Sequence, residues 1–201
     1  MPSDTFAKLP AKKKKAIFSA AVEEFAARSF SQASINQVVR TAGISRGSFY
    51  QYFQDKEDLY MYVLGEIAKE KMAVAVATRD LNSDADFFQV YRAMFLDILA
   101  WAETQPQYHR ISMLMDYDDS QFIARLREEF SGNWKFFNHL IERDKERGRI
   151  RRDVDVEMVT EILFAFNKHF FQEYWHTGSR EKLIYQMEET LKILKGGIAS
   201  V

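Results

Sequence analysis

Cysteine is absent from this 201-residue chain, and proline and glycine are scarce, at 3 and 8 residues. Without cysteine there is no disulfide, thiolate metal site or cysteine nucleophile, which suits a reducing compartment. So few turn-forming residues argue against a many-stranded β protein. The chain also lacks a run of about 18 apolar residues and an apolar stretch after its charged leader. We therefore expect a helical, cytoplasmic protein with no signal peptide and no membrane partner.

A large net charge is also missing, because the formal total is -1. The average hides a split. Residues 1–54 contain eight basic and three acidic residues, a net charge of +5, which leaves −6 for the rest of the chain. A basic segment joined to an acidic body is typical of a protein with one end facing nucleic acid. A solvated lysine run would give the same imbalance, so charge alone leaves both interpretations open.

Apolar residues recur at helical spacing along most of the chain, and a hydrophobic fraction of 47% is enough for a packed core. The pattern predicts an all-α fold of about nine helices after a frayed leader that ends near Pro10. We expect a three-helix domain in residues 1–55 and a helical ligand-binding and dimerisation domain in 56–201. Residues 81–84 are expected to interrupt the helical structure, and one continuous helix is expected over residues 120–146.

The strongest functional pattern lies in residues 34–53, where two short helices flank a turn that contains Gly43. Glycine fits the left-handed position at the end of a helix, and Ser34 with Gln37 has capping-box spacing. These features predict a helix-turn-helix. A helix pair buried in a core would have the same apolar spacing, but a polar, non-acidic outer surface favours DNA. The outward residues of the second helix are Arg46, Gly47, Ser48 and Gln51.

Residues 17–25, 42–53 and 55–59 resemble the N-terminal domain of the TetR family of bacterial repressors. That family shares an alanine-rich first helix ending in Phe, followed by a run of spaced residues. This chain matches the run at Ala42, Gly43, Ser45, Gly47, Tyr50, Phe53, Lys56 and Leu59. The resemblance covers about the first 60 residues. The remainder is similar to the family in being helical, of the right length and rich in aromatic residues.

The resemblance implies a DNA-binding regulator, usually a repressor, and gives roles to individual residues. Phosphate contacts position such a protein, whereas base contacts read the sequence. A half-buried packing role for Tyr52 and a mostly solvated state for Lys12 to Lys15 remain open alternatives. Gln37, Arg46 and Gln51 would face bases; Ser34 and Lys56 would contact phosphate; Ser45, Ser48, Tyr50 and Tyr52 would bind phosphates or bases; Gly47 would allow close backbone approach; and Lys12 to Lys15 would approach the adjacent backbone or minor groove.

The resemblance also implies a homodimer in which the last two helices of each chain form a four-helix interface. Two apolar stripes agree with this, one with Leu163 and Phe166 and the other with Met187 and Leu191. A dimer would place two recognition helices on successive major grooves of a palindromic operator. Ligand binding would then change the spacing of these two helices.

Aromatic residues are concentrated after residue 87, which favours an apolar cavity for a bulky hydrophobic inducer, by analogy with the family. For any single ring, packing in the core is the simpler interpretation. The residues proposed for the cavity are Phe88, Tyr91, Phe95, Tyr108, Met113, Tyr117, Phe122, Trp134, Phe137 and Phe170.

An enzyme is not expected, because the chain has no G-x-S-x-G motif, phosphate loop or cysteine. His169 and Glu173 are one turn apart and could ligate a metal, as could the acidic residues at 116–119, but two ligands on one turn are a weak signal. We expect no metal and no cofactor. A helical adaptor that binds protein partners without a small-molecule ligand remains the alternative function.

Overall fold

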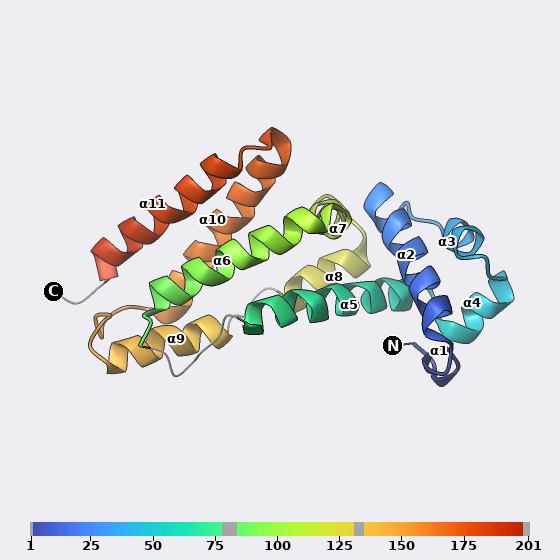
Figure 1. The fold of residues 1–201 in the computed structure, drawn as a ribbon, viewed down its shortest axis with the longest axis horizontal. Helices are drawn as coiled ribbons and strands as arrows, with labels where there is room; N and C mark the ends of the chain where they lie inside the picture. Colours follow the sequence, from blue (N-terminus) through green and yellow to red (C-terminus); the bar gives the residue numbers. More distant parts are fainter. Residues whose placement is uncertain (1, 78–83, 131–134, 199–201) are drawn as a thin grey trace. The chain divides into compact units, whose positions relative to one another are not determined.

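The computed structural model describes residues 2–77, 84–130 and 135–198, and within these ranges the chain forms eleven α-helices (Figure 1). The predicted all-α fold is confirmed, but the predicted number of helices is wrong. One additional helix, α1 (Asp4–Ala7), lies in the leader that was expected to be frayed. The other arises because the predicted helix over 120–146 is two helices, α8 and α9. The break expected at 81–84 falls almost wholly outside the described residues.

The chain divides into two compact units, residues 1–77 with 98–131 and residues 78–97 with 132–201. The predicted boundary at residue 55 does not coincide with a boundary between them and stays a prediction about function. Unit 1 contains α1, α2 (Ala11–Ala27), α3 (Ile35–Ala42), α4 (Arg46–Tyr52), α5 (Lys56–Ala77), α7 (Pro106–Asp116) and α8 (Gln121–Phe130). Unit 2 contains α9 (Lys135–Glu146), α10 (Val156–Thr177) and α11 (Arg180–Ile198), and α6 (Phe87–Thr104) is divided between the units after Asp97.

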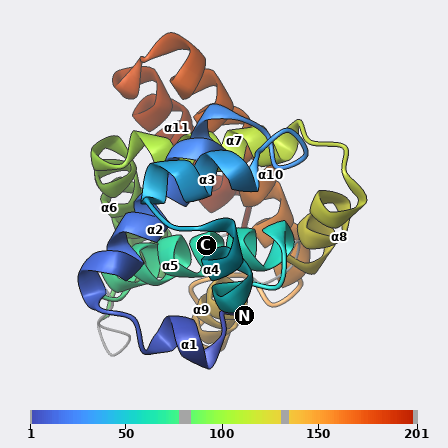
Figure 2. The ribbon, with the colours of Figure 1, turned by 90° about the vertical axis from the view of Figure 1, so that its right-hand side faces the viewer.

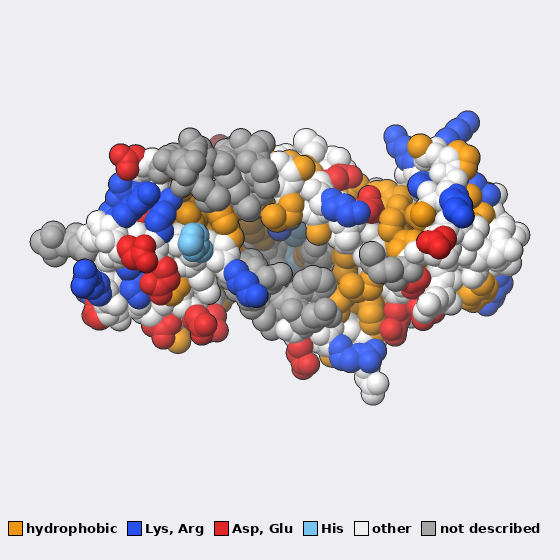
Figure 3. Space-filling view, turned by 90° about the horizontal axis from the view of Figure 1, so that it is seen from below, with side chains coloured by type: hydrophobic (Ala, Val, Ile, Leu, Met, Phe, Trp, Pro, Cys, Tyr) orange, Lys and Arg blue, Asp and Glu red, His pale blue; other side chains and the backbone are white. Residues whose placement is uncertain are grey.

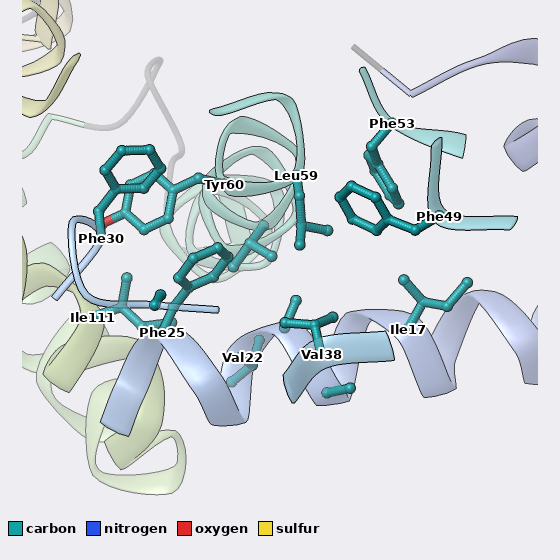
Figure 4. Packing of buried hydrophobic residues seen from close by; sticks show 14 of the residues in the cluster. Ile17, Val22, Phe25, Phe30, Val38, Phe49, Phe53, Leu59, Tyr60 and Ile111 are labelled. Atoms are coloured by element: carbon teal, nitrogen blue, oxygen red, sulfur yellow. The ribbon is translucent and has the colours of Figure 1, made fainter. Parts of the chain in front are cut away.

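The core of unit 1 is built from apolar residues that recur once per helical turn on α2 and meet the short helices. Ile17 and Phe25 of α2 are buried, as are Val38 of α3 and Phe49 of α4. Figure 4 shows these side chains pointing toward one another and toward Leu59 of α5. Burying this many apolar side chains fixes α3 and α4 on a rigid support.

Short-range caps mark several helix ends. Asp55 caps α5 by accepting a 2.8 Å hydrogen bond from the N–H of Asp58, and Asp155 caps α10 in the same way through Met158 at 3.0 Å. Gly178 ends α10 with a φ of 71°, in the left-handed region that favours glycine. These short-range signals are local, which is why the sequence reveals them.

In unit 2, the long helices α10 and α11 pack against each other through buried residues that include Leu163 and Met187. The wholly buried Asp144 of α9 accepts a 2.6 Å hydrogen bond from the N–H of Phe87, the first residue of α6. The Arg143 guanidinium lies 2.9 Å from the other oxygen of this carboxylate. The buried charge is therefore compensated, and it also holds the start of α6.

Candidate nucleic-acid interface

The turn between α3 and α4 has the geometry that a helix-turn-helix requires. Gly43 adopts a φ of 65°, and the N–H of Ile44 returns to the carbonyl of Val39 at 3.0 Å. The hydroxyl of Ser45 caps α4 by accepting the N–H of Ser48 at 3.0 Å. Figure 2 shows α3 and α4 lying across α2 on the same side of unit 1. The turn and the caps therefore set the angle between the two helices.

One face of α4 is exposed and carries groups suited to reading bases. Arg46 and Gln51 are exposed, and the Tyr50 side chain is 47% exposed. The Arg46 guanidinium donates a 2.8 Å hydrogen bond to Oδ1 of Asn36 on α3, and it lies 5.7 Å from the centre of the Tyr50 ring. These contacts hold the arginine across the α3–α4 surface before any partner binds, which lowers the entropy cost of a base contact.

A surface groove of about 390 Å³ lies elsewhere, on unit 2, but a smaller one of about 300 Å³ adjoins this face of α4. The smaller groove is lined by Ala33, Ser34, Ile35, Asn36, Arg46 and Lys56, at the amino end of α3. Two cations and a helix N-terminus together favour an anion. In Figure 3, Lys and Arg side chains (blue) project from the right-hand side of the view, where the amino-terminal helices lie.

The loop before α3 is held by charged side chains. The ammonium of Lys56 donates to the carbonyls of Ser31 and Ala33 at 3.2 and 3.0 Å. The N–H of Ser34 donates to the buried Glu24 at 2.8 Å. Burial lowers the pKa of Lys56, although nearby carboxylates act in the opposite direction. Lys56 therefore fixes the entrance to α3 as well as lining the groove.

A second buried carboxylate holds the same loop from the turn between α7 and α8. Asp118 is 2% exposed, and its two oxygens accept the N–H groups of Ser31 at 2.7 Å and Ser120 at 2.9 Å. Burial alone would raise the pKa of Asp118, but the hydrogen bonds from Ser120 and Ser31 hold it well below its usual value. Arg127 fixes the turn through the carbonyls of Asp116 and Asp118, both at 2.9 Å.

The structure groups several residues that the sequence predicted for DNA. Ser34, Arg46 and Lys56 line one groove, while Ser45 and Ser48 share a 2.9 Å hydroxyl contact at the start of α4. Gly47 is exposed beside them. These positions are compatible with the predicted contacts, which remain predictions.

Two predictions about individual residues need correction. Tyr52 is 4% exposed and packs against Phe6, so the structure places its ring in the core of unit 1 and not on the DNA-facing surface. The capping box at Ser34 does not form, because the Ser34 side chain makes no cap hydrogen bond and the Gln37 side chain accepts from Arg40 instead. Loss of the box leaves the Ser34 hydroxyl free to face the groove.

Sequence reasoning missed Asn36, Glu24 and Asp118. Asn36 lies in the first turn of α3, next to the polar residue Gln37, so its exposed position could have been predicted from the sequence. Asp118 had no such signal, since its hydrogen-bond partner Ser31 lies 87 residues away.

The predicted cavity residues are divided between the two units. Tyr91 of unit 2 is buried, accepts a hydrogen bond from the Asn167 amide and lies 5.4 Å from the Phe137 ring. Burial raises the pKa of Tyr91 well above its usual value. The ring centre of Phe95 lies 5.3 Å from that of Phe171. Of the remaining unit 2 residues, Phe88 lines the 390 Å³ groove and Phe170 stacks on Phe166.

Four other predicted cavity residues belong to unit 1. The ring centre of Phe122 lies 4.6 Å from that of Phe30, at the edge of the unit 1 core. The Tyr117 side chain is 64% exposed. Tyr108 and Met113 are partly buried on α7. Trp134 lies outside the described residues. The gathering of the ten residues into one cavity stays a prediction.

His109 is a titratable group on α7 that the sequence analysis did not assign to a function. Burial and the neighbouring Lys71 lower its pKa to about 4, although Asp116 acts to raise it. The imidazole is therefore neutral at pH 7. Within the described ranges, no group of three or more His, Asp or Glu could hold a metal ion, and no helix has the length and apolar composition needed to cross a bilayer.

The family model described as "Bacterial regulatory proteins, tetR family" matches residues 17–63, which include α3, α4 and the start of α5. The chain is 25% identical over 171 residues to the HTH-type transcriptional repressor BepR of Brucella suis biovar 1, covering 83% of this chain and 82% of that protein.

Solved structures agree. The crystal structure of a TetR family transcriptional regulator from Chloroflexus aurantiacus matches with a TM-score of 0.69 and 26% identity over 100% of both chains. The transcriptional regulator FadR from Bacillus subtilis, crystallised with stearoyl-CoA, matches with a TM-score of 0.74 and 16% identity, covering 92% of this chain and 99% of that one. At that identity the second likeness concerns the fold alone.

Proposed function

The chain belongs to the TetR family of transcriptional regulators, and from that premise we propose that it is a homodimeric repressor, released from a palindromic operator by a bulky hydrophobic small molecule. The observation that carries the proposal is the exposed face of α4, where Tyr50 of α4 and Asn36 of the neighbouring α3 hold Arg46 in place. We also propose that the protein acts in the cytoplasm, where a bacterial operator is found.

In the proposed complex, α4 enters the major groove. Arg46 donates to a guanine edge and Gln51 reaches an adenine, the pairings that their geometry favours. A phosphate lies in the groove between Ser34 and Lys56, at the amino end of α3. These two kinds of contact divide the work, because the phosphate positions the protein and the base edges provide specificity.

The proposed dimer forms through α10 and α11. These helices bury one apolar face against each other, yet they also present large apolar side chains to solvent. Phe166 is 46% exposed, Tyr185 65% and Ile193 72%. A second copy would cover this surface in a four-helix arrangement. Twofold symmetry would then place two α4 helices about 34–36 Å apart, one turn of B-DNA.

Two observations support a hydrophobic inducer. The FadR relative was crystallised with stearoyl-CoA, a molecule with a long apolar chain. In this chain, aromatic rings pair within unit 2. The buried Tyr91 packs against the partly buried Phe137 and has the Asn167 amide as a polar partner, and the buried Phe95 packs against Phe171. An apolar lining with a few polar groups is the usual composition of a small-molecule site.

Selection of duplexes from a random DNA pool tests the proposal, with the full-length protein and an Arg46→Ala variant run in parallel. We expect the protein to enrich a palindrome, to bind it with a steep salt dependence, and to release it when a long-chain acyl-CoA or another apolar ligand is added. Enrichment of no sequence over random DNA would contradict the repressor function and favour a protein-binding adaptor. Enrichment unaffected by a broad apolar panel would contradict the inducer class alone.

A further inference from the structure

The segment ahead of α2 closes the carboxyl end of α4. The N–H of Ser3 donates to the carbonyl of Tyr52 at 2.9 Å, and its hydroxyl donates to the carbonyl of Gln51 at 2.6 Å. The same hydroxyl oxygen accepts the N–H of Phe6 at 3.3 Å and so caps α1. One serine thus satisfies orphan backbone groups at the end of one helix and at the start of another.

Phe6 anchors this contact in the core of unit 1. It is 4% exposed, and its ring centre lies 4.9 Å from that of Phe53, 5.0 Å from that of Tyr62 and 6.1 Å from that of Tyr52. The segment is also tied to α2, because the ammonium of Lys14 donates to the carbonyl of Ala7 at 2.6 Å. Phe6 and these hydrogen bonds therefore tie residues 3–7 to α2 and α4.

The α4 helix needs such support because it has only seven residues, from Arg46 to Tyr52. Helices this short are unstable alone, and their last carbonyls have no partner within the helix. The Phe49 carbonyl accepts the N–H of Phe53 at 2.9 Å. The carbonyls of Gln51 and Tyr52 in the last turn accept their hydrogen bonds from Ser3. That turn carries Gln51, an exposed side chain on the DNA-facing surface.

We infer that Ser3 and Phe6 are positioning residues for the recognition helix α4, so that the functional DNA-binding domain extends ahead of the residues 17–63 that the family model matches. This inference rests on the DNA-binding function proposed above. Ser3 sets the last turn of α4, and through it the position from which Gln51 reaches a base. Phe6 keeps Ser3 in register by filling the space between α4 and α5.

The test compares Ser3→Ala with Ser3→Thr, which restores a hydroxyl, and with Thr5→Ala, a matched change at an exposed position of α1. Amide hydrogen exchange over residues 46–53 is measured in the full-length protein without DNA. We expect faster exchange at Tyr50 to Phe53 in Ser3→Ala, and wild-type rates in Ser3→Thr, in Thr5→Ala and, for every variant, in α10. Unchanged exchange in Ser3→Ala would overturn the inference.

A second measurement uses the duplex selected by the wild-type protein. Ser3→Ala should bind it about fivefold more weakly, the typical effect of losing one helix cap. In a Gln51→Ala background the same substitution should have little effect, because the side chain that Ser3 positions is gone. Equal effects in both backgrounds would overturn the inference by assigning Ser3 a general structural role. If the wild-type protein selects no duplex, the proposed function fails, while the exchange measurement still decides whether Ser3 orders α4.

Discussion

Asp118 accepts a 2.7 Å hydrogen bond from the backbone N–H of Ser31, although 87 residues separate the two. The contact joins the turn between α7 and α8 to the loop that leads into α3. The helix α7 also carries Tyr108 and Met113, two of the residues predicted for the inducer cavity. A displacement of this turn would therefore be felt at the amino end of α3, where we propose that a phosphate binds.

Replacing Asp118 with asparagine should weaken both folding and DNA binding. Both carboxylate oxygens accept backbone N–H groups, and an amide can replace only one of them. We expect the free energy of unfolding to fall by about 1–3 kcal/mol in urea titrations, with weaker binding to the selected duplex. Asp119→Asn, at the exposed neighbouring position, is the control. Equal stability of the two variants would show that the Asp118 hydrogen bonds contribute nothing.

The stability of the folded protein should decrease as the pH falls through the range in which His109 takes up a proton. Its pKa in the folded protein is about 4, against 6.5 for an ordinary histidine, so the folded state binds fewer protons in this interval. Its contribution is complete above pH 6.5 and is lost as the pH falls toward 4, at up to about 1.4 kcal/mol per pH unit.

Melting temperatures at pH 7, 5.5 and 4.5 measure this effect. In His109→Gln the decrease over this interval should be smaller, while His139→Gln, at an exposed position, should keep the wild-type slope. A His109→Gln slope identical to the wild-type slope would refute the assignment.

Arg46→Ala should reduce affinity for the selected duplex by about 1–3 kcal/mol for each half-site and relax the preference at one base position in each half-site. The reason is that Asn36 and Tyr50 hold this guanidinium over the exposed face of α4. Fluorescence anisotropy with single-base variants of the duplex measures both effects. Arg152→Ala, exposed in unit 2, should change neither of them. Uniform weakening at all base positions would make Arg46 a phosphate contact.

The lysine run distinguishes a phosphate contact from a solvated surface. Lys12 and Lys15 are exposed on α2. If each meets a phosphate, as we expect, then Lys12→Ala and Lys15→Ala should each reduce the slope of log affinity against log salt by about 0.9 for each copy in the dimer, or about 1.8 in all. The Arg152→Ala variant again serves as the reference. An unchanged slope would favour the solvated alternative.

Ile193→Glu should convert the proposed dimer into a monomer, because it places a charge in the apolar surface that the second copy covers. Sedimentation at micromolar concentration measures the change. Lys192→Glu is a larger change of charge at the adjacent exposed position, and it should leave the mass of the dimer unchanged. A dimer in both variants would locate the interface elsewhere.

Much of the DNA-facing unit was predictable because its signals are local. Gly43 acts at the turn where it stands, and the structure confirms its left-handed conformation. The caps formed by Ser45 and Asp55 likewise act within three residues of their own positions. The apolar spacing on α2 likewise predicts a buried face at Ile17 and Phe25. Short-range capping and helical periodicity thus determine the elements and their order.

The remainder depends on contacts between residues far apart in the chain. The family resemblance implied a DNA contact for Tyr52, but its ring packs against Phe6 in the core of unit 1, and nothing near residue 6 in the sequence indicates that contact. The long helix predicted over 120–146 has an unbroken apolar period, yet α8 and α9 belong to different units. Periodicity describes a helix face and does not say which partner covers it.

The capping of α4 by Ser3 also has a practical consequence for anyone who purifies the protein. An affinity tag joined ahead of Ser3 would lie close to the carbonyls of Gln51 and Tyr52. A bulky or charged tag there would disturb the hydrogen bonds from Ser3 to these two carbonyls, and the measured DNA affinity would then depend on the tag used for expression. A tag at the other end of the chain, or a traceless amino-terminal cleavage, avoids this source of disagreement between laboratories.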